Sequence, residues 1–117
     1  MVVRQGDVFW AALLPPAGSE PGYRHPVVVL QSDLFNQTQI QTVVVCILTS
    51  NLRLATAPGN VLLARGEANL PRRGVVNITQ LVAVDKSDLL AKIGTVSKDR
   101  LGQILAGVHF LLHPSEE

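Results

Sequence analysis

The feature that most constrains the fold of this 117-residue sequence is a series of short apolar runs, each interrupted by Gly, Pro, Asn or Ser. The runs are rich in Val, Ile and Leu and recur every 10–20 residues or so, roughly the spacing of strands in a small all-β fold. Six runs are expected to be strands: Asp7–Leu14, Pro26–Gln31, Thr42–Leu48, Asn60–Ala64, Val75–Val84 and Ile93–Val96. The pattern therefore predicts a mainly β (α+β) barrel of about six to seven short strands.

Several of these runs are apolar at every position, as in Val27–Leu30. Such strands are covered on both faces, either by a barrel interior and a helix or by another subunit. The run Val75–Val84 is expected to be kinked or bulged near Thr79 and Gln80. A short helical turn is expected between Asp85 and Leu90.

One segment has the period of an amphipathic helix. Apolar side chains recur at spacings of three and four residues from Leu101 to Leu112. Ser97 is a suitable N-cap, and Asp99 places a carboxylate in the first turn. We expect a helix from about Lys98 to Leu112, with its apolar stripe packed on the sheet.

The composition supports one domain over residues 1–117, since 47% of the residues are hydrophobic and 16% are charged. A single cysteine, Cys46, excludes an internal disulfide and a cysteine-rich zinc site. His109 and His113 share a helix face but have no third ligand at metal spacing. We therefore expect no cofactor and no metal. The longest apolar run, Val43–Leu48, is too short to span a membrane, and we expect a cytoplasmic protein.

The formal net charge is only +1, but the charges are unevenly distributed. The segment Ser50–Val75 contains four arginines and one glutamate, a local charge of +3. Arginine suits phosphate because its forked guanidinium matches the geometry of the anion. Scattered surface charge is an equally good interpretation of this segment when it is taken alone.

Two polar stretches lie next to predicted strands. In the loop Gly18–Pro26, two glycines and two prolines restrict the backbone, and Arg24 and His25 stand just before the strand. Arg24 can neutralise a phosphate, and His25 can exchange a proton near neutral pH. Thr49, Ser50 and Asn51 follow an apolar run and can hydrogen-bond a phosphate oxygen. Either stretch can equally be a turn that ends a strand.

Together, five blocks of this sequence resemble the MazF/PemK family of toxin endoribonucleases. The blocks are Gln5–Trp10, Gly18–Leu30, Val45–Asn51, Val76–Leu81 with Asp85–Ser87, and Ile93–Val96. They occur in order and cover nearly the whole chain. The block that begins Gly-Ser-Glu and ends Pro-Val-Val-Val-Leu is the specific part of the match.

The resemblance implies an SH3-like barrel with a C-terminal helix, forming a homodimer. It implies the toxin of a type II toxin–antitoxin module that cleaves single-stranded RNA at specific sequences without a metal. In the family reaction the ribose 2′-OH attacks the adjacent phosphate and leaves a 2′,3′-cyclic phosphate and a 5′-OH. A cognate antitoxin is implied as a second partner.

The resemblance also implies catalytic residues. Family members usually have Arg directly before the Pro that opens the second strand, whereas here His25 holds that position and Arg24 comes one residue earlier. Arg24 suits stabilisation of the phosphorane, and His25 is the nearby acid or base. Thr49 matches the family's hydroxyl residue. We expect catalytic roles for Arg24, Thr49 and His25, in that order.

Further side chains are candidates for contacts with RNA bases or backbone. These substrate-binding candidates are Ser19, Glu20, Tyr23, Ser50, Asn51, Arg53, Asn77 and Gln80. For each one alone, plain loop solvation is an equal alternative. Trp10 and Cys46 lie in predicted strands and are interpreted as packing residues.

Two other functions compete with RNA cleavage. A CcdB-like gyrase poison shares the fold but acts through an apolar end of the C-terminal helix, and here the sequence ends His113-Pro-Ser-Glu-Glu. An inert SH3-like binding module is the third possibility. It gives no reason for Arg24 and Thr49 to match the family's positions.

Overall fold

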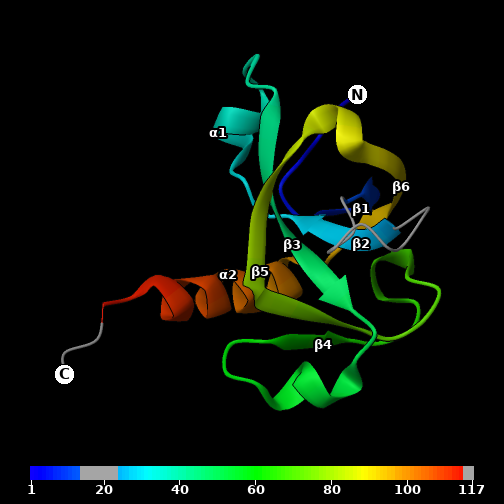
Figure 1. Ribbon diagram of the computed structural model, residues 1–117, viewed down its shortest axis with the longest axis vertical. Helices are drawn as coiled ribbons and strands as arrows, with labels where there is room; N and C mark the ends of the chain where they lie inside the picture. Colours follow the sequence, from blue (N-terminus) through cyan, green and yellow to red (C-terminus); the bar gives the residue numbers. More distant parts are fainter. Residues whose placement is uncertain (14–23, 115–117) are drawn as a thin grey trace.

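The computed structural model describes residues 1–13 and 24–114, which form a curled antiparallel sheet with a long helix against it (Figure 1). The strands are β1 (Asp7–Ala12), β2 (Arg24–Val29), β3 (Thr42–Thr49), β4 (Val61–Leu63), β5 (Gly74–Asp85) and β6 (Leu89–Thr95). Within the described residues these six strands form one sheet in the order β4-β5-β3-β2-β1-β6. The predicted mainly β, SH3-like barrel with a C-terminal helix is confirmed.

Short helical turns connect several of the strands. They are α1 (Asp33–Asn36) and the 3₁₀ turns η2 (Leu52–Thr56), η3 (Glu67–Asn69) and η4 (Lys86–Asp88). The turn η4 confirms the expected turn between Asp85 and Leu90. The turn α1 was not expected, and it is capped by the Ser32 hydroxyl, which accepts a hydrogen bond from the Leu34 N–H.

The strands that are apolar on both faces are buried within a single chain. Successive side chains of a strand point to opposite faces, so Val28 joins one core while Val27 and Val29 join the other. The helix-side core includes Cys46 and Leu48 of β3, and Ile104 of the helix packs against it. The other core fills the concave interior, and it is completed by Val84 near the end of β5 and by Leu89 at the start of β6. Of the two sequence alternatives, the structure therefore shows a barrel interior plus a helix.

The bulge expected in Val75–Val84 is confirmed. Strand β5 pairs with β3 at Leu81 and Cys46 and again at Val76 and Leu48, so β5 has extra residues between these two pairs. A bulge of this kind strengthens the local twist and bends the strand. The bend lets β5 pair with β3 along its length and with β4 at its first residues, Gly74–Val76.

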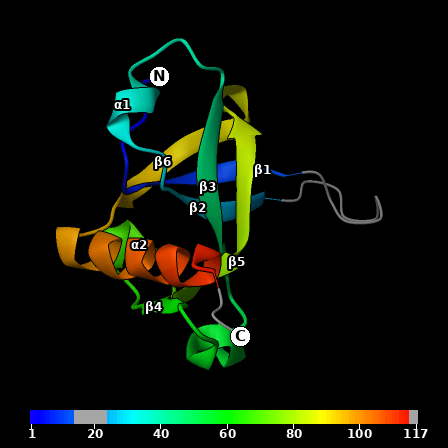
Figure 2. The ribbon, with the colours of Figure 1, turned by 90° about the vertical axis from the view of Figure 1, so that its left-hand side faces the viewer.

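Helix α2 (Lys98–Leu112) has the bounds that the apolar period predicts. The Ser97 hydroxyl caps it by accepting a hydrogen bond from the Arg100 N–H at 3.1 Å. Figure 2 shows α2 lying across the sheet beside β4 and β5. The helix approaches the loop before β4 so closely that a Cβ at Gly107 would collide with the Gly59 carbonyl oxygen. No helix in the described part of the chain is long and apolar enough to cross a membrane.

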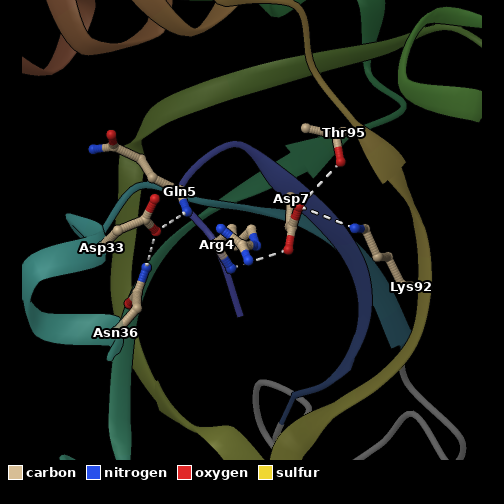
Figure 3. Close-up of polar contacts among 7 residues, drawn as sticks. All are labelled: Arg4, Gln5, Asp7, Asp33, Asn36, Lys92 and Thr95. Atoms are coloured by element: carbon tan, nitrogen blue, oxygen red, sulfur yellow. Dashed lines mark hydrogen bonds and ion pairs between the residues drawn. The ribbon is translucent and has the colours of Figure 1, made fainter. Parts of the chain in front are cut away.

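Two carboxylates hold the N-terminal segment against the sheet (Figure 3). Asp7 is buried, accepts a hydrogen bond from the Arg4 N–H, and pairs with Lys92 at 3.2 Å. Asp33 of α1 accepts a hydrogen bond from the Gln5 N–H at 2.7 Å. This backbone hydrogen bond lowers the pKa of Asp33 below its ordinary value.

Candidate active site

A cavity of about 140 Å³ opens where three strands end or begin. Strand β3 lies between β5 and β2 in the sheet, so the end of β3 forms the middle of this site. Trp10 and Arg24 come from the β1–β2 side, and Arg72 and Arg73 come from the loop that leads into β5. The sheet order thus brings together residues that are far apart in the sequence.

Arg24 lies at the exposed first position of β2, and its guanidinium carbon is 5.4 Å from the centre of the Trp10 ring. The register explains this contact, because Arg24 pairs with Ala12 and Trp10 is two residues away on the same face. A cation over an indole face is attracted by the ring's negative quadrupole. The Trp10 ring therefore favours one position of the Arg24 guanidinium beside the cavity.

His25 points to the opposite face of β2 from Arg24, because strand side chains alternate. It is half-buried and pairs with Ala11 of β1 in the register. Thr49 lies on the corresponding face of β3, since Leu48 joins the helix-side core and Ile47 packs on the other core. The last pair in the β2–β3 register joins Val27 to Ile47. Beyond this pair, His25 lies two residues from Val27, and Thr49 lies two residues from Ile47. The alternation therefore places His25 and Thr49 on one face of the sheet and Arg24 on the other, and the cavity at the strand ends is lined by residues of both faces.

Thr49 and Ser50 line the cavity at the end of β3. The Thr49 hydroxyl accepts a hydrogen bond from the Asn51 N–H at 3.1 Å. A hydroxyl that accepts one bond can still donate its own hydrogen. Thr49 is half-buried and Ser50 is exposed, so each can offer a donor to an oxyanion in the cavity.

The charge around the cavity is entirely positive among the described residues that line it. Arg24, Arg72 and Arg73 line it, and no Asp or Glu does so. The local charge of the Ser50–Val75 segment predicted a cationic region, and Arg72 and Arg73 supply the part of it that lies at the site. No local motif marks these two arginines as site residues, and the prediction that Trp10 is a packing residue omits its place in the cavity lining.

Other predicted binding residues lie outside this cavity. Asn51 caps η2, where its side-chain oxygen accepts a hydrogen bond from the Arg53 N–H, and Arg53 is exposed on that turn. Asn77 donates a hydrogen bond to the Gln80 side chain at 3.0 Å in the β5 bulge. Ser19, Glu20 and Tyr23 lie outside the described residues. Within residues 24–114, the structure thus brings together Arg24, His25, Thr49 and Ser50 of the candidate set.

Cys46 is fully buried in the helix-side core, as expected for a small apolar residue. Burial raises the pKa of its thiol to about 12, so it is an inert thiol at neutral pH. His109 and His113 have ring centres 5.4 Å apart at the end of α2. Among the described residues, no cluster of three or more His, Cys, Asp or Glu side chains could hold a metal ion.

Comparison with known proteins places these features in a family. Residues 4–112 match the family model described as PemK-like, MazF-like toxin of type II toxin–antitoxin system. The chain is 40% identical over 112 residues to endoribonuclease MazF2 of Mycobacterium bovis, covering 96% of this chain and 98% of the relative. Endoribonuclease MazF6 of Mycobacterium tuberculosis gives the same identity and coverage.

Solved structures show the same fold. The MazE–MazF complex of Deinococcus radiodurans (Form II) matches with a TM-score of 0.78 at 25% identity, over 98% of this chain and 99% of that chain. A mycobacterial endoribonuclease in complex with its cognate antitoxin matches with a TM-score of 0.77 at 21% identity, over 97% of this chain and 98% of that chain.

Proposed function

The chain belongs to the PemK-like, MazF-like toxin family of type II toxin–antitoxin systems, and from this premise we propose that it is an endoribonuclease. Its substrate is single-stranded RNA, cleaved at specific sequences in mRNA, so that translation and growth are inhibited. The reaction takes place in the cytoplasm and needs no metal.

One observation carries the proposal: Arg24, His25 and Thr49 line one cavity, whose described lining residues include two further arginines and no carboxylate. An RNA phosphodiester is an anion, and single-stranded RNA exposes its 2′-OH and base edges. The cavity lining therefore offers guanidinium groups, hydroxyl donors and an imidazole to an RNA phosphate.

The proposed reaction is an internal transfer at phosphorus. The 2′-oxygen forms a bond to phosphorus, and the bond from phosphorus to the 5′-oxygen of the next nucleotide breaks. One proton leaves the 2′-OH and one proton joins the 5′-oxygen, so the products are a 2′,3′-cyclic phosphate and a 5′-OH. The phosphorane between these states carries extra negative charge, which fixed cations stabilise.

Each of the three residues has a role that fits its chemistry. Arg24 remains charged and stabilises the phosphorane. Thr49 donates its hydroxyl hydrogen to a non-bridging oxygen. His25 lies on the Thr49 face and exchanges the proton of the 2′-OH or of the leaving oxygen.

The test is cleavage of a labelled single-stranded RNA by the purified protein in the presence of EDTA. We expect discrete fragments that end in cyclic phosphate, and loss of cutting in Thr49→Ala and in Arg24→Ala. Arg65→Gln is the control. Arg65 is exposed and lies outside the cavity lining, and its substitution also removes one positive charge. Full cutting by Arg24→Ala would contradict its assigned role. Inhibition of gyrase without RNA cleavage would support the CcdB-like alternative.

We also propose that the chain forms a homodimer and binds a cognate antitoxin. Support for an association surface comes from apolar side chains at the end of α2, where Phe110 is 65% exposed and Leu112 is 66% exposed. Support for an antitoxin comes from the relatives that were solved with theirs. Sedimentation of the purified chain tests the dimer. Co-expression with the product of a neighbouring short reading frame tests the antitoxin, which is expected to suppress cleavage.

A further inference from the structure

The cavity has more apolar surface than a phosphate requires. Trp10, Pro26, Leu48, Leu70 and Pro71 line it alongside the arginines and hydroxyl groups. Trp10 is only half-buried, so the part of its ring that Arg24 does not cover is accessible to a ligand. Leu48 and Leu70 belong to the helix-side core, so the apolar surface that a phosphate does not account for is that of Trp10, Pro26 and Pro71.

The size of the cavity matches one aromatic ring. Its volume is about 140 Å³, and an apolar protein cavity of about 150 Å³ is large enough to hold benzene. The ligand must therefore combine a flat ring with a negative charge, because the ring meets an indole and the rim is cationic. A nucleotide of single-stranded nucleic acid has both parts, and bases stack on aromatic side chains and on guanidinium planes.

We infer that this cavity is a nucleobase subsite of the proposed RNA site, with Trp10 as its stacking residue. Arg72 and Arg73 bind a phosphate next to that base from the β5 side, while Arg24 faces the RNA from the β2 side. The inference rests on the proposed endoribonuclease function, because the base arrives as part of the RNA. It adds Trp10, Arg72 and Arg73 to the residues that bind substrate.

The test uses the fact that Trp10 is the only tryptophan in the chain, so its fluorescence reports this cavity alone. The probe is an RNA oligonucleotide that spans the cleaved sequence and carries a 2′-deoxy substitution at the cleaved nucleotide, which prevents the reaction. We expect binding of this oligonucleotide to quench the Trp10 fluorescence. A series with one abasic position at a time should show a single position at which quenching is lost and affinity falls about 10- to 100-fold.

Variants test the aromatic ring and the charges in turn. Trp10→Leu should raise KM about 10- to 100-fold and should also lower kcat, because it removes the ring over which Arg24 lies, whereas Trp10→Phe should retain most of the affinity because it keeps an aromatic ring. Arg72 and Arg73 are exposed, so Arg72→Gln and Arg73→Gln are expected to fold normally. Both should weaken binding of the same oligonucleotide, whereas Arg65→Gln, outside the cavity lining, should not.

The outcomes distinguish the two proposals. If the wild-type chain cuts RNA but Trp10→Leu, with a wild-type thermal transition, binds the oligonucleotide with unchanged affinity, the subsite is wrong and the endoribonuclease function stands. If the oligonucleotide binds without any change in Trp10 fluorescence, the subsite is also wrong. If the wild-type chain neither binds nor cuts RNA, the proposed function fails and the subsite fails with it.

Discussion

The side chain on which the proposed chemistry depends most is Arg24, and its surroundings explain how an exposed residue keeps a defined position. An arginine at a strand end would ordinarily sample several rotamers, but the Trp10 ring 5.4 Å from its guanidinium carbon favours one of them. Unlike an ammonium, a guanidinium over an indole can stack on the ring and still present N–H groups to an anion. A lysine at this position would keep the charge but lose the planar stack.

This difference gives a prediction for two variants at position 24. Arg24→Gln should lower kcat by about 10²- to 10³-fold, because one preorganised donor to the developing charge is removed. Arg24→Lys should fall between Gln and the wild type, since the charge remains but the fork and the stack are lost. Single-turnover cleavage of a labelled RNA measures both values. Equal rates for the lysine variant and the wild type would contradict a role for the stacked, planar group.

The candidate residues also show what a sequence can predict about a site. Arg24, His25 and Thr49 were predicted from the family resemblance, since each local stretch taken alone can equally be a turn that ends a strand. Strand alternation places Arg24 on one face and His25 on the other, and this could be predicted once β2 was assigned as a strand. Trp10 and the arginines before β5 could not be assigned to the site, because their meeting depends on the order of strands in the sheet.

At the scale of elements, helix α2 shows how local signals and long-range contacts share control of the structure. The apolar period and the Ser97 cap predict both ends of the helix. Its position on the sheet instead depends on two glycines, because Gly59 and Gly107 allow the loop backbone and the helix backbone to touch. This contact could not be predicted from the sequence, since three strands lie between the two glycines along the chain.

The two glycines inside α2 should therefore respond to alanine in opposite ways. Gly107→Ala should lower the free energy of unfolding by about 1–3 kcal/mol, because the new methyl group meets the Gly59 backbone, which cannot move aside as a side chain would. Gly102→Ala is the matched control: nothing lies within 4 Å of its Cβ position, and the change should add about 0.5–1 kcal/mol through helix propensity. Urea denaturation of the two variants measures both effects. A Gly107→Ala variant as stable as Gly102→Ala would contradict the close backbone contact.

The attachment of the N-terminal segment to α1 predicts a pH dependence of stability. Hydrogen bonds from the Gln5 N–H and the Asn36 side chain lower the pKa of Asp33 below its ordinary value of 3.8. A carboxyl whose pKa is lower in the folded state stabilises the fold above its unfolded pKa, and this stabilisation is lost as the pH falls through the folded pKa. Glu67 behaves in the same way, since the hydrogen bond from Arg100 lowers its pKa below 4.5.

Asp33→Asn should therefore lose less stability than the wild type when the pH is lowered from 5 to about 2.5. The variant is expected to be less stable than the wild type at pH 7, and the two should converge in acid. The double variant Asp33→Asn, Glu67→Gln should show the flattest dependence. Urea denaturation midpoints across this range measure the effect, and parallel curves for Asp33→Asn and the wild type would rule out the titration of Asp33 as a cause.

At the scale of the whole molecule, the sequence indicated the fold class more firmly than the arrangement of its surfaces. Strands that are apolar on both faces left open whether a second subunit covers one face. The structure buries both faces within one chain, because the curled sheet encloses one core and α2 covers the other. Burial on two faces therefore carried no information about the dimer, whose support lies in the exposed end of α2.

The net charge of the whole molecule likewise does not indicate RNA binding, since a value of +1 conceals a cationic site. Three arginines line the cavity, and each phosphate that they neutralise releases condensed counterions from the RNA. For single strands, the slope of log K against log salt concentration is about −0.7 per phosphate contact, so three contacts predict a slope of roughly −2. The net charge plays no part in this slope.

Titration of the uncleavable RNA oligonucleotide at several salt concentrations measures this value through the Trp10 fluorescence. Arg73→Gln should reduce the magnitude of the slope by about 0.7, because one phosphate contact is lost. Lys98→Gln is the control, since Lys98 is an equally exposed cation at the start of α2 and lies outside the cavity lining. If both variants reduced the slope equally, the whole surface charge would govern RNA binding. If only Arg73→Gln reduced the slope, the phosphate contact would lie at the cavity, because the slope counts the counterions released where a cation contacts a phosphate.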